Sequence, residues 1–115
     1  MSAKEANESA TPIRTDQGQW QSLSTPGVSL KVLRSDRETG GSTILLKFEA
    51  GASFPAHNHP GGEEVYVIEG DIKLGKHELN AGDYLYTPPE GKHAAVSKNG
   101  CLILVSVAKP IEILK

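Results

Sequence analysis

The chain has 115 residues, of which 37% are hydrophobic, and its 12 Lys and Arg against 14 Asp and Glu give a formal net charge of −2. This length suits one domain and leaves no room for a second hydrophobic core. No basic run supports binding to nucleic acid or to an anionic membrane surface, and no apolar run approaches the roughly 20 residues of a membrane-spanning helix, so we expect a soluble protein.

Residues 1–12 are polar and lack periodicity, which predicts a flexible N-terminal arm ahead of one domain over residues 13–115. The N-terminus lacks the apolar segment of a secretory signal, and the lone Cys101 has no partner for an internal disulfide. We therefore expect a cytoplasmic protein. Cys101 begins an apolar run, Cys-Leu-Ile-Leu-Val, and is predicted to lie in the core.

From residue 20 onward, short runs of β-type composition alternate with turns rich in Gly, Pro, Asn and Asp. The predicted strands are residues 20–24, 28–34, 42–49, 63–69, 71–74 with 77–79, 84–87, 94–97 and 102–107, and a final one at 111–114. No segment has a clear helical pattern. So many strands in about 100 residues favour an all-β barrel or jelly roll, because closure removes exposed sheet edges.

Two histidines, His57 and His59, stand one residue apart between flanking prolines. If this segment is extended, both imidazoles project from one face. The Pro-Gly-Gly sequence at residues 60–62 can reverse the chain, which would place Glu63 across from His59. Cross-strand neighbours have Cβ atoms about 5 Å apart, so these side chains could share one metal ion.

Glu64 is an alternative to Glu63 as the carboxylate ligand, because adjacent strand residues face opposite sides of a sheet. The residue pattern alone leaves both open, since both faces of this strand carry apolar residues. The fourth histidine, His77, stands in a charged Gly-Lys-His-Glu hairpin and is predicted to lie on the surface.

These residues resemble the first sequence motif of the cupin family, which here reads Gly51, His57, His59, Glu63 and Gly70. The run from Gly82 to His93 resembles the second motif and puts His93 at the position of the third histidine ligand. The family spacing also favours Glu63 over Glu64. Two departures are visible: Gly91 lies one residue closer to His93 than usual, and Ser97 replaces a common Asn.

Across roughly residues 20–108 the order of motifs looks like the cupin-like domain of ChrR-type anti-sigma factors. The resemblance implies a double-stranded β-helix, or jelly-roll barrel, with one metal ion held by His57, His59, Glu63 and His93. For the ChrR type that metal is zinc, whereas three histidines and one carboxylate suit Zn²⁺, Fe²⁺, Mn²⁺ or Ni²⁺. The resemblance also implies a homodimer, with residues 20–34 as a candidate contact.

Two functions follow from this site. One is a metal-dependent oxygenase (dioxygenase) acting on a small organic molecule, because an open metal position in an apolar barrel can accept both substrate and O₂. The other is a non-catalytic zinc-binding module for sensing or structure, like the ChrR-type domain, though the short segment before Trp20 offers no anti-sigma helical domain. A metal-free sugar epimerase of the wider superfamily is disfavoured, because it would not need four ligands.

Overall fold

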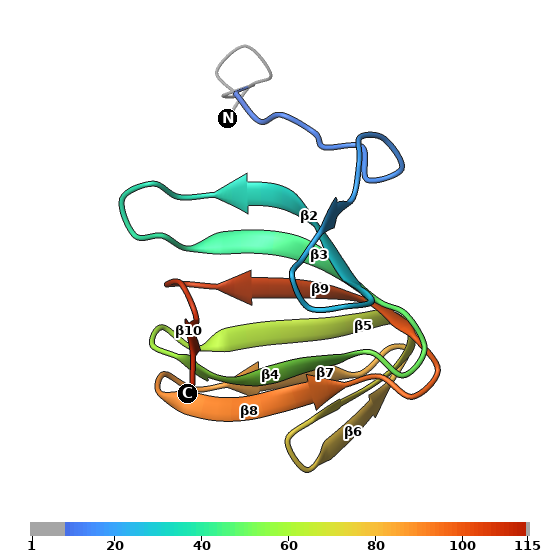
Figure 1. Cartoon of the computed structure of the whole chain (residues 1–115). Coiled ribbons are helices and arrows are strands. Elements are labelled where there is room, and N and C mark those ends of the chain that lie inside the picture. Colours follow the sequence, from blue (N-terminus) through green and yellow to red (C-terminus); the bar gives the residue numbers. More distant parts are fainter. Residues whose placement is uncertain (1–8, 115) are drawn as a thin grey trace.

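The computed structural model describes residues 9–114, and within that range it contains ten β-strands and no helix (Figure 1). The strands are β1 (Gln21–Ser22), β2 (Val28–Ser35), β3 (Ser42–Phe48), β4 (Ser53–His59), β5 (Glu63–Leu74), β6 (His77–Asn80), β7 (Tyr84–Thr87), β8 (Gly91–Val96), β9 (Cys101–Val107) and β10 (Glu112–Ile113). Their order is β1-β2-β3-β9-β5-β8-β4-β10, with β6 and β7 also paired to β5. The predicted all-β fold is confirmed.

Strand β5 connects the two halves of the barrel. Residues 63–70 pair with β9 and in part with β7, in the sheet that contains β1, β2 and β3. Residues 71–74 pair with β6 and β8, in the sheet that contains β4 and β10. The sequence predicted a break at Gly70, but the strand continues, because glycine accepts the φ of +79° found there and a Cβ would collide with Gly100.

Strand β4 was not among the predicted strands, and it does not pair with β5. It pairs with β8 and β10 instead. The turn at residues 60–62, in which the Gly62 N–H donates to the His59 carbonyl at 3.0 Å, carries the chain from one sheet to the other. The expected hairpin between His59 and Glu63 is therefore wrong, because these two residues face each other across the barrel interior rather than along one sheet.

The core lies between the two sheets and consists of the inward-facing residues of β5, β9 and the strands beside them. Val65, Val67, Ile72 and Ile103 are each no more than 2% exposed. Their alternation with exposed neighbours along each strand follows from the two-residue period of β-structure. Cys101 is also buried, as predicted.

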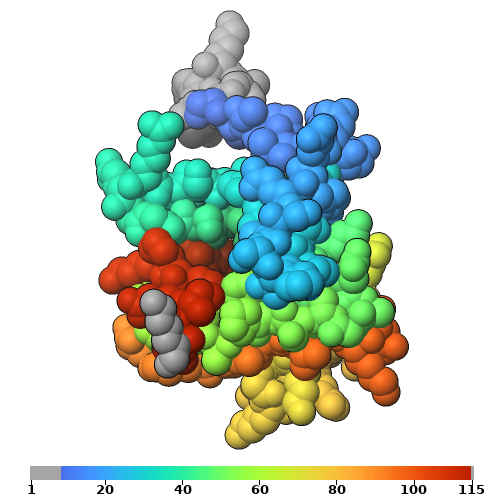
Figure 2. Space-filling model, viewed as in Figure 1, coloured from blue at the N-terminus to red at the C-terminus, as the bar shows by residue number. Residues whose placement is uncertain are grey.

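Residues 15–20 pack on the outside of the barrel. Lys31 Nζ donates to the carbonyl oxygens of Thr15 and Gln17 at 2.9 and 3.1 Å, and Trp20 lies between Lys31 and Lys47, with ammonium-to-ring distances of 5.0 and 5.2 Å. In Figure 2 the blue residues that precede β2 lie against green residues, where the Glu49 N–H donates to the Gly27 carbonyl at 2.8 Å.

Only two residues of the predicted strand at 20–24 form a strand, β1. Most of the predicted flexible arm, residues 1–8, lies outside the described residues. The homodimer contact expected at residues 20–34 stays a prediction. In the described part of the chain no helix is long and apolar enough to cross a membrane.

Candidate metal centre

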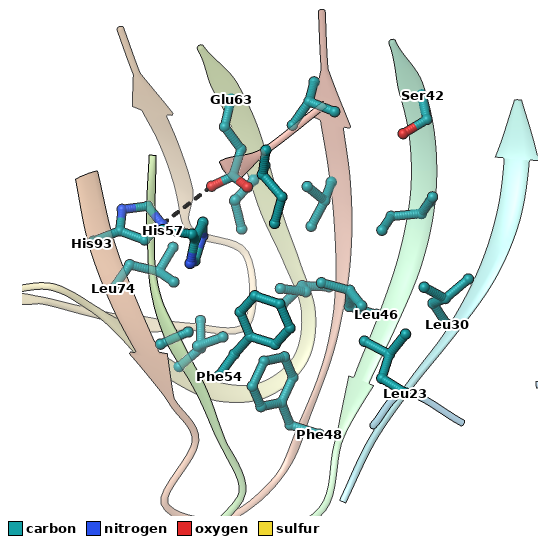
Figure 3. A pocket seen from close by; sticks show the side chains of 18 of the residues that line it. Leu23, Leu30, Ser42, Leu46, Phe48, Phe54, His57, Glu63, Leu74 and His93 are labelled. Carbon is teal, nitrogen blue, oxygen red and sulfur yellow. Dashed lines mark ion pairs between the residues drawn. The ribbon is translucent and has the colours of Figure 1, made fainter. Parts of the chain in front are cut away.

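The four predicted ligands come together at one end of the barrel interior. Figure 3 shows three of them, His57, Glu63 and His93. His57 and His59 come from β4, Glu63 begins β5, and His93 lies on β8 as the register partner of His57. One ligand atom from each side chain lies within 4.8 Å of the other three. His57, His59 and Glu63 are 5%, 0% and 7% exposed, so these polar side chains are largely shielded from solvent.

Backbone carbonyls set the orientation of the β4 histidines. His57 Nδ1 lies 2.8 Å from the Pro55 oxygen, and His59 Nδ1 lies 2.7 Å from the Gly91 oxygen. A carbonyl only accepts hydrogen bonds, so each Nδ1 carries a proton, and in the neutral ring each Nε2 keeps its lone pair. This is the arrangement of a metal-binding histidine. Gly91, whose spacing departs from the cupin pattern, thus supplies the acceptor for His59.

Glu63 lies between two of the rings. Its Oε2 is 3.3 Å from His59 Nε2, and its Oε1 is 3.4 Å from His93 Nε2. Burial alone would raise the pKa of Glu63, but the neighbouring His59 and His93 rings lower it to about 2. The carboxylate is therefore ionised throughout the physiological range.

The pKa values of the two β4 histidines are shifted in opposite directions. Burial lowers the pKa of His57 below its usual 6.5, which favours the neutral ring that a metal needs. Burial alone would also lower the pKa of His59, but the Glu63 carboxylate raises it overall.

Three buried atoms of the cluster have no hydrogen-bond partner: His59 Nε2, Glu63 Oε1 and His93 Nε2. Buried polar atoms are almost always paired, so such a group of unpaired atoms requires an explanation. All three point to one common volume, and imidazole nitrogen with carboxylate oxygen is the donor set that suits Zn²⁺ and Fe²⁺. The residues therefore fit a divalent metal ion.

Sequence reasoning missed a pair of hydrogen bonds that anchor β4. Asn58, which stands between His57 and His59 in the sequence, is buried and donates through Nδ2 to Glu90 Oε2 at 3.0 Å and to Glu112 Oε1 at 2.9 Å. The Glu90 N–H donates to the His59 carbonyl at 2.8 Å, and Glu90 adopts a φ of +69° to do so. Partners 32 and 54 residues away leave no local signal in the sequence.

The two remaining candidates lie outside the cluster. Glu64 is exposed on the outer face of β5 and accepts a hydrogen bond from the Tyr84 hydroxyl at 2.7 Å. His77 is exposed on β6, as predicted. The structure therefore selects Glu63 as the carboxylate that faces the histidines.

A cavity of about 380 Å³ opens beside the cluster. His57, Glu63 and His93 border it, whereas His59 lies behind them and does not line it. Apart from these three residues its wall is apolar except for Ser42, with lining residues that include Leu23, Leu30, Ile44, Leu46, Phe48, Phe54, Val65, Leu74, Ile103, Val105 and Ile111. Its size is that of a small-molecule site.

Solved structures of similar shape include a candidate acetylacetone dioxygenase from Methylibium petroleiphilum, with a TM-score of 0.87 and 22% identity, over 96% of this chain and 85% of that one. At this identity the likeness establishes the cupin barrel and no more. The complex of SigE with the anti-sigma ChrR from Rhodobacter sphaeroides matches at a TM-score of 0.70 and 26% identity, over 82% of this chain and 50% of that one.

Two curated relatives are similar in sequence. The acetylacetone-cleaving enzyme of Acinetobacter johnsonii is 28% identical over 80 residues, which are 70% of this chain and 52% of the enzyme. A DNA damage-repair/toleration protein of Arabidopsis thaliana is 39% identical over 74 residues, 59% of this chain and 23% of that protein. The chain thus spans about half or less of these relatives.

The family model described as the ChrR Cupin-like domain matches residues 8–109, most of the chain. The fold, the barrel site and this match agree with the family expected from the motifs. The chain belongs to the ChrR Cupin-like family.

Proposed function

We propose that His57, His59, Glu63 and His93 bind one divalent metal ion, and that the protein is a metal-dependent oxygenase acting on a small neutral dicarbonyl compound. The observation that carries this proposal is the apolar cavity that opens directly on the cluster. When bound, an ion such as Fe²⁺ supplies a Lewis acid and open positions for O₂ and substrate.

The four side chains of the cluster differ in their access to the cavity. His59 is fully buried behind the site, while His57, Glu63 and His93 border the cavity. The uncovered side of the cluster therefore faces the space in which a substrate would lie. The surrounding apolar wall excludes water and favours a neutral guest.

The acetylacetone-cleaving enzyme of Acinetobacter johnsonii supports a β-diketone as the substrate class. Among the residues that the structure describes, Ser42 is the only polar lining side chain besides the cluster, so no separate acid or base lines the cavity. Chemistry at this site would therefore depend on the metal.

The test is oxygen uptake by Fe²⁺-loaded protein with acetylacetone. We expect uptake that requires the diketone, is lost in His93→Ala and persists in His77→Ala, which removes an exposed histidine outside the cluster. A fully iron-loaded protein that consumes no O₂ with any of a panel of β-diketones would overturn the oxygenase proposal.

The family match favours a second candidate, a non-catalytic zinc-binding module. Four protein donors can saturate a tetrahedral Zn²⁺, as in structural sites. In that case the protein purified from cells would contain zinc, removal of zinc would lower its melting temperature, and iron substitution would produce no oxygen uptake.

A further inference from the structure

We propose that the cavity beyond the metal centre binds an unbranched apolar tail, so that the preferred substrate is a long-chain dicarbonyl compound rather than a compact one. The head group would lie at His57, Glu63 and His93, and the tail would extend toward Leu23, Leu30 and Leu46. The position of the head group rests on the proposed function; the tail site rests on the shape and chemistry of the cavity.

The cavity extends far from the ligands. Leu30 lies on β2 and Glu63 on β5, and the order β2-β3-β9-β5 separates them by three strand spacings. Three spacings are roughly 14 Å along the sheet. Figure 3 shows Leu23 and Leu30 on the opposite side of the pocket from His57 and His93. A five-carbon diketone held at the ligands would leave this far end empty.

The far end is also built for a neutral guest. Within residues 9–114 no Lys or Arg lines the cavity, and Ser42 is the only polar lining side chain outside the ligand cluster. A charged tail would lose its hydration there without gaining a partner. An alkyl tail would instead gain about 0.8 kcal/mol for each buried methylene, or about fourfold in affinity.

Phe54 lines the cavity next to the ligand end. Its ring meets the His57 ring edge-on, with centroids 5.2 Å apart and an interplanar angle of 81°, and it lines the cavity together with Phe48. Figure 3 places both phenylalanines between the ligand end and the leucines. Strands β2 and β3 fix Leu30 and Leu46, and the Leu23 N–H donates to the Val28 carbonyl at 3.0 Å. The wall of the tail site is therefore built on paired backbone.

The experiment is calorimetric binding of pentane-2,4-dione, heptane-2,4-dione and nonane-2,4-dione to Zn²⁺-loaded protein without O₂. Each step adds two methylenes, so we expect Kd to fall by about 15-fold per step. Leu30→Trp should fill the far end, leaving the Kd of pentane-2,4-dione unchanged and removing most of the gain for nonane-2,4-dione.

Ser29→Trp is the matched control, because Ser29 is the neighbour of Leu30 on β2 and faces away from the cavity. It should bind the series as the wild type does. Leu46→Phe is a milder second filling variant for use if Leu30→Trp does not fold, as judged by circular dichroism, and it should reduce the same gain.

The outcomes separate the two proposals. If pentane-2,4-dione supports oxygen uptake but Kd does not fall with chain length, or if Leu30→Trp and Ser29→Trp behave alike, the tail site is wrong and the oxygenase stands. If affinity rises with chain length and no diketone supports oxygen uptake, the tail site stands and the oxygenase is wrong. No binding of any diketone would overturn both.

Discussion

Among the described residues, two polar clusters differ in how completely their atoms are paired: one at Asp71 and the buried Ser97, and the buried metal cluster. In the cluster at Asp71, Ser97 Oγ donates to the Asp71 carbonyl at 2.6 Å, and the carboxylate accepts from the Lys98 N–H and Asn99 Nδ2 at 2.9 and 2.8 Å. In the metal cluster, His59 Nε2, Glu63 Oε1 and His93 Nε2 accept or donate no hydrogen bond. The atoms named in the first cluster are paired within the protein, whereas the three atoms of the second cluster remain available to a metal ion.

This difference separates a structural role from a ligand-binding role. Ser97 replaces the Asn common in the cupin pattern, and it is fully buried and joins the end of β8 to β5 through its hydrogen bond to the Asp71 carbonyl. The hydrogen bonds from Asn99 lower the pKa of Asp71. The metal cluster differs in that three of its buried ligand atoms have no hydrogen-bond partner.

The largest effect is expected on metal content when two of the four ligands are removed. In a His57→Ala, His59→Ala double variant, two of the four donors are removed, so the metal content should fall from about one ion per chain to near zero. Elemental analysis after desalting measures this. A double variant that retains full occupancy would show that the metal binds elsewhere.

Lowering the pH should release the metal from the same cluster without a mutation. Metal binding requires neutral imidazoles, so protons compete with the ion as the pH falls through the histidine range, near the ordinary pKa of about 6.5. Glu63 is not the limiting group, because its pKa of about 2 keeps it ionised. The Glu63 carboxylate raises the pKa of His59, which favours proton uptake at this ring. Dialysis from pH 8 to pH 4.5 with metal analysis tests this, and an unchanged content at pH 4.5 would contradict it.

A smaller effect is expected from the cluster at Asp71. Ser97→Ala leaves the Asp71 carbonyl without its buried donor and should lower the free energy of unfolding by about 1–3 kcal/mol, with metal content unchanged. Urea denaturation measures this loss. Ser53→Ala, at an exposed serine of β4, should stay within about 0.5 kcal/mol of the wild type. Loss of metal in Ser97→Ala would mean that the two clusters are coupled.

The smallest effect is expected at Glu64. Glu64→Gln removes a charge that is exposed and contacts only the Tyr84 hydroxyl among the hydrogen bonds and ion pairs described for it, so metal affinity should be unchanged. The adjacent Glu63→Gln removes a charge inside the cluster and should weaken metal binding by at least tenfold. Competition with a metal chelator compares the two variants, and equal affinities would refute the choice of Glu63.

Local sequence determined the strands with strong alternation and the His-x-His geometry. The two-residue period of β-structure places His57 and His59 on one face wherever the segment is extended, and glycine-rich turns mark most strand ends. Family spacing added His93 and favoured Glu63, and the structure brings these residues together.

The partners of these residues were decided only by the tertiary structure. Both faces of β5 carry apolar residues, so parity could not choose between Glu63 and Glu64 until the turn at residues 60–62 carried the chain between sheets. The carbonyl of Gly91, the contacts of Asn58 and the apolar length of the cavity arise from segments tens of residues apart. Local propensity acts over a few residues, whereas these contacts exist only once the barrel has closed.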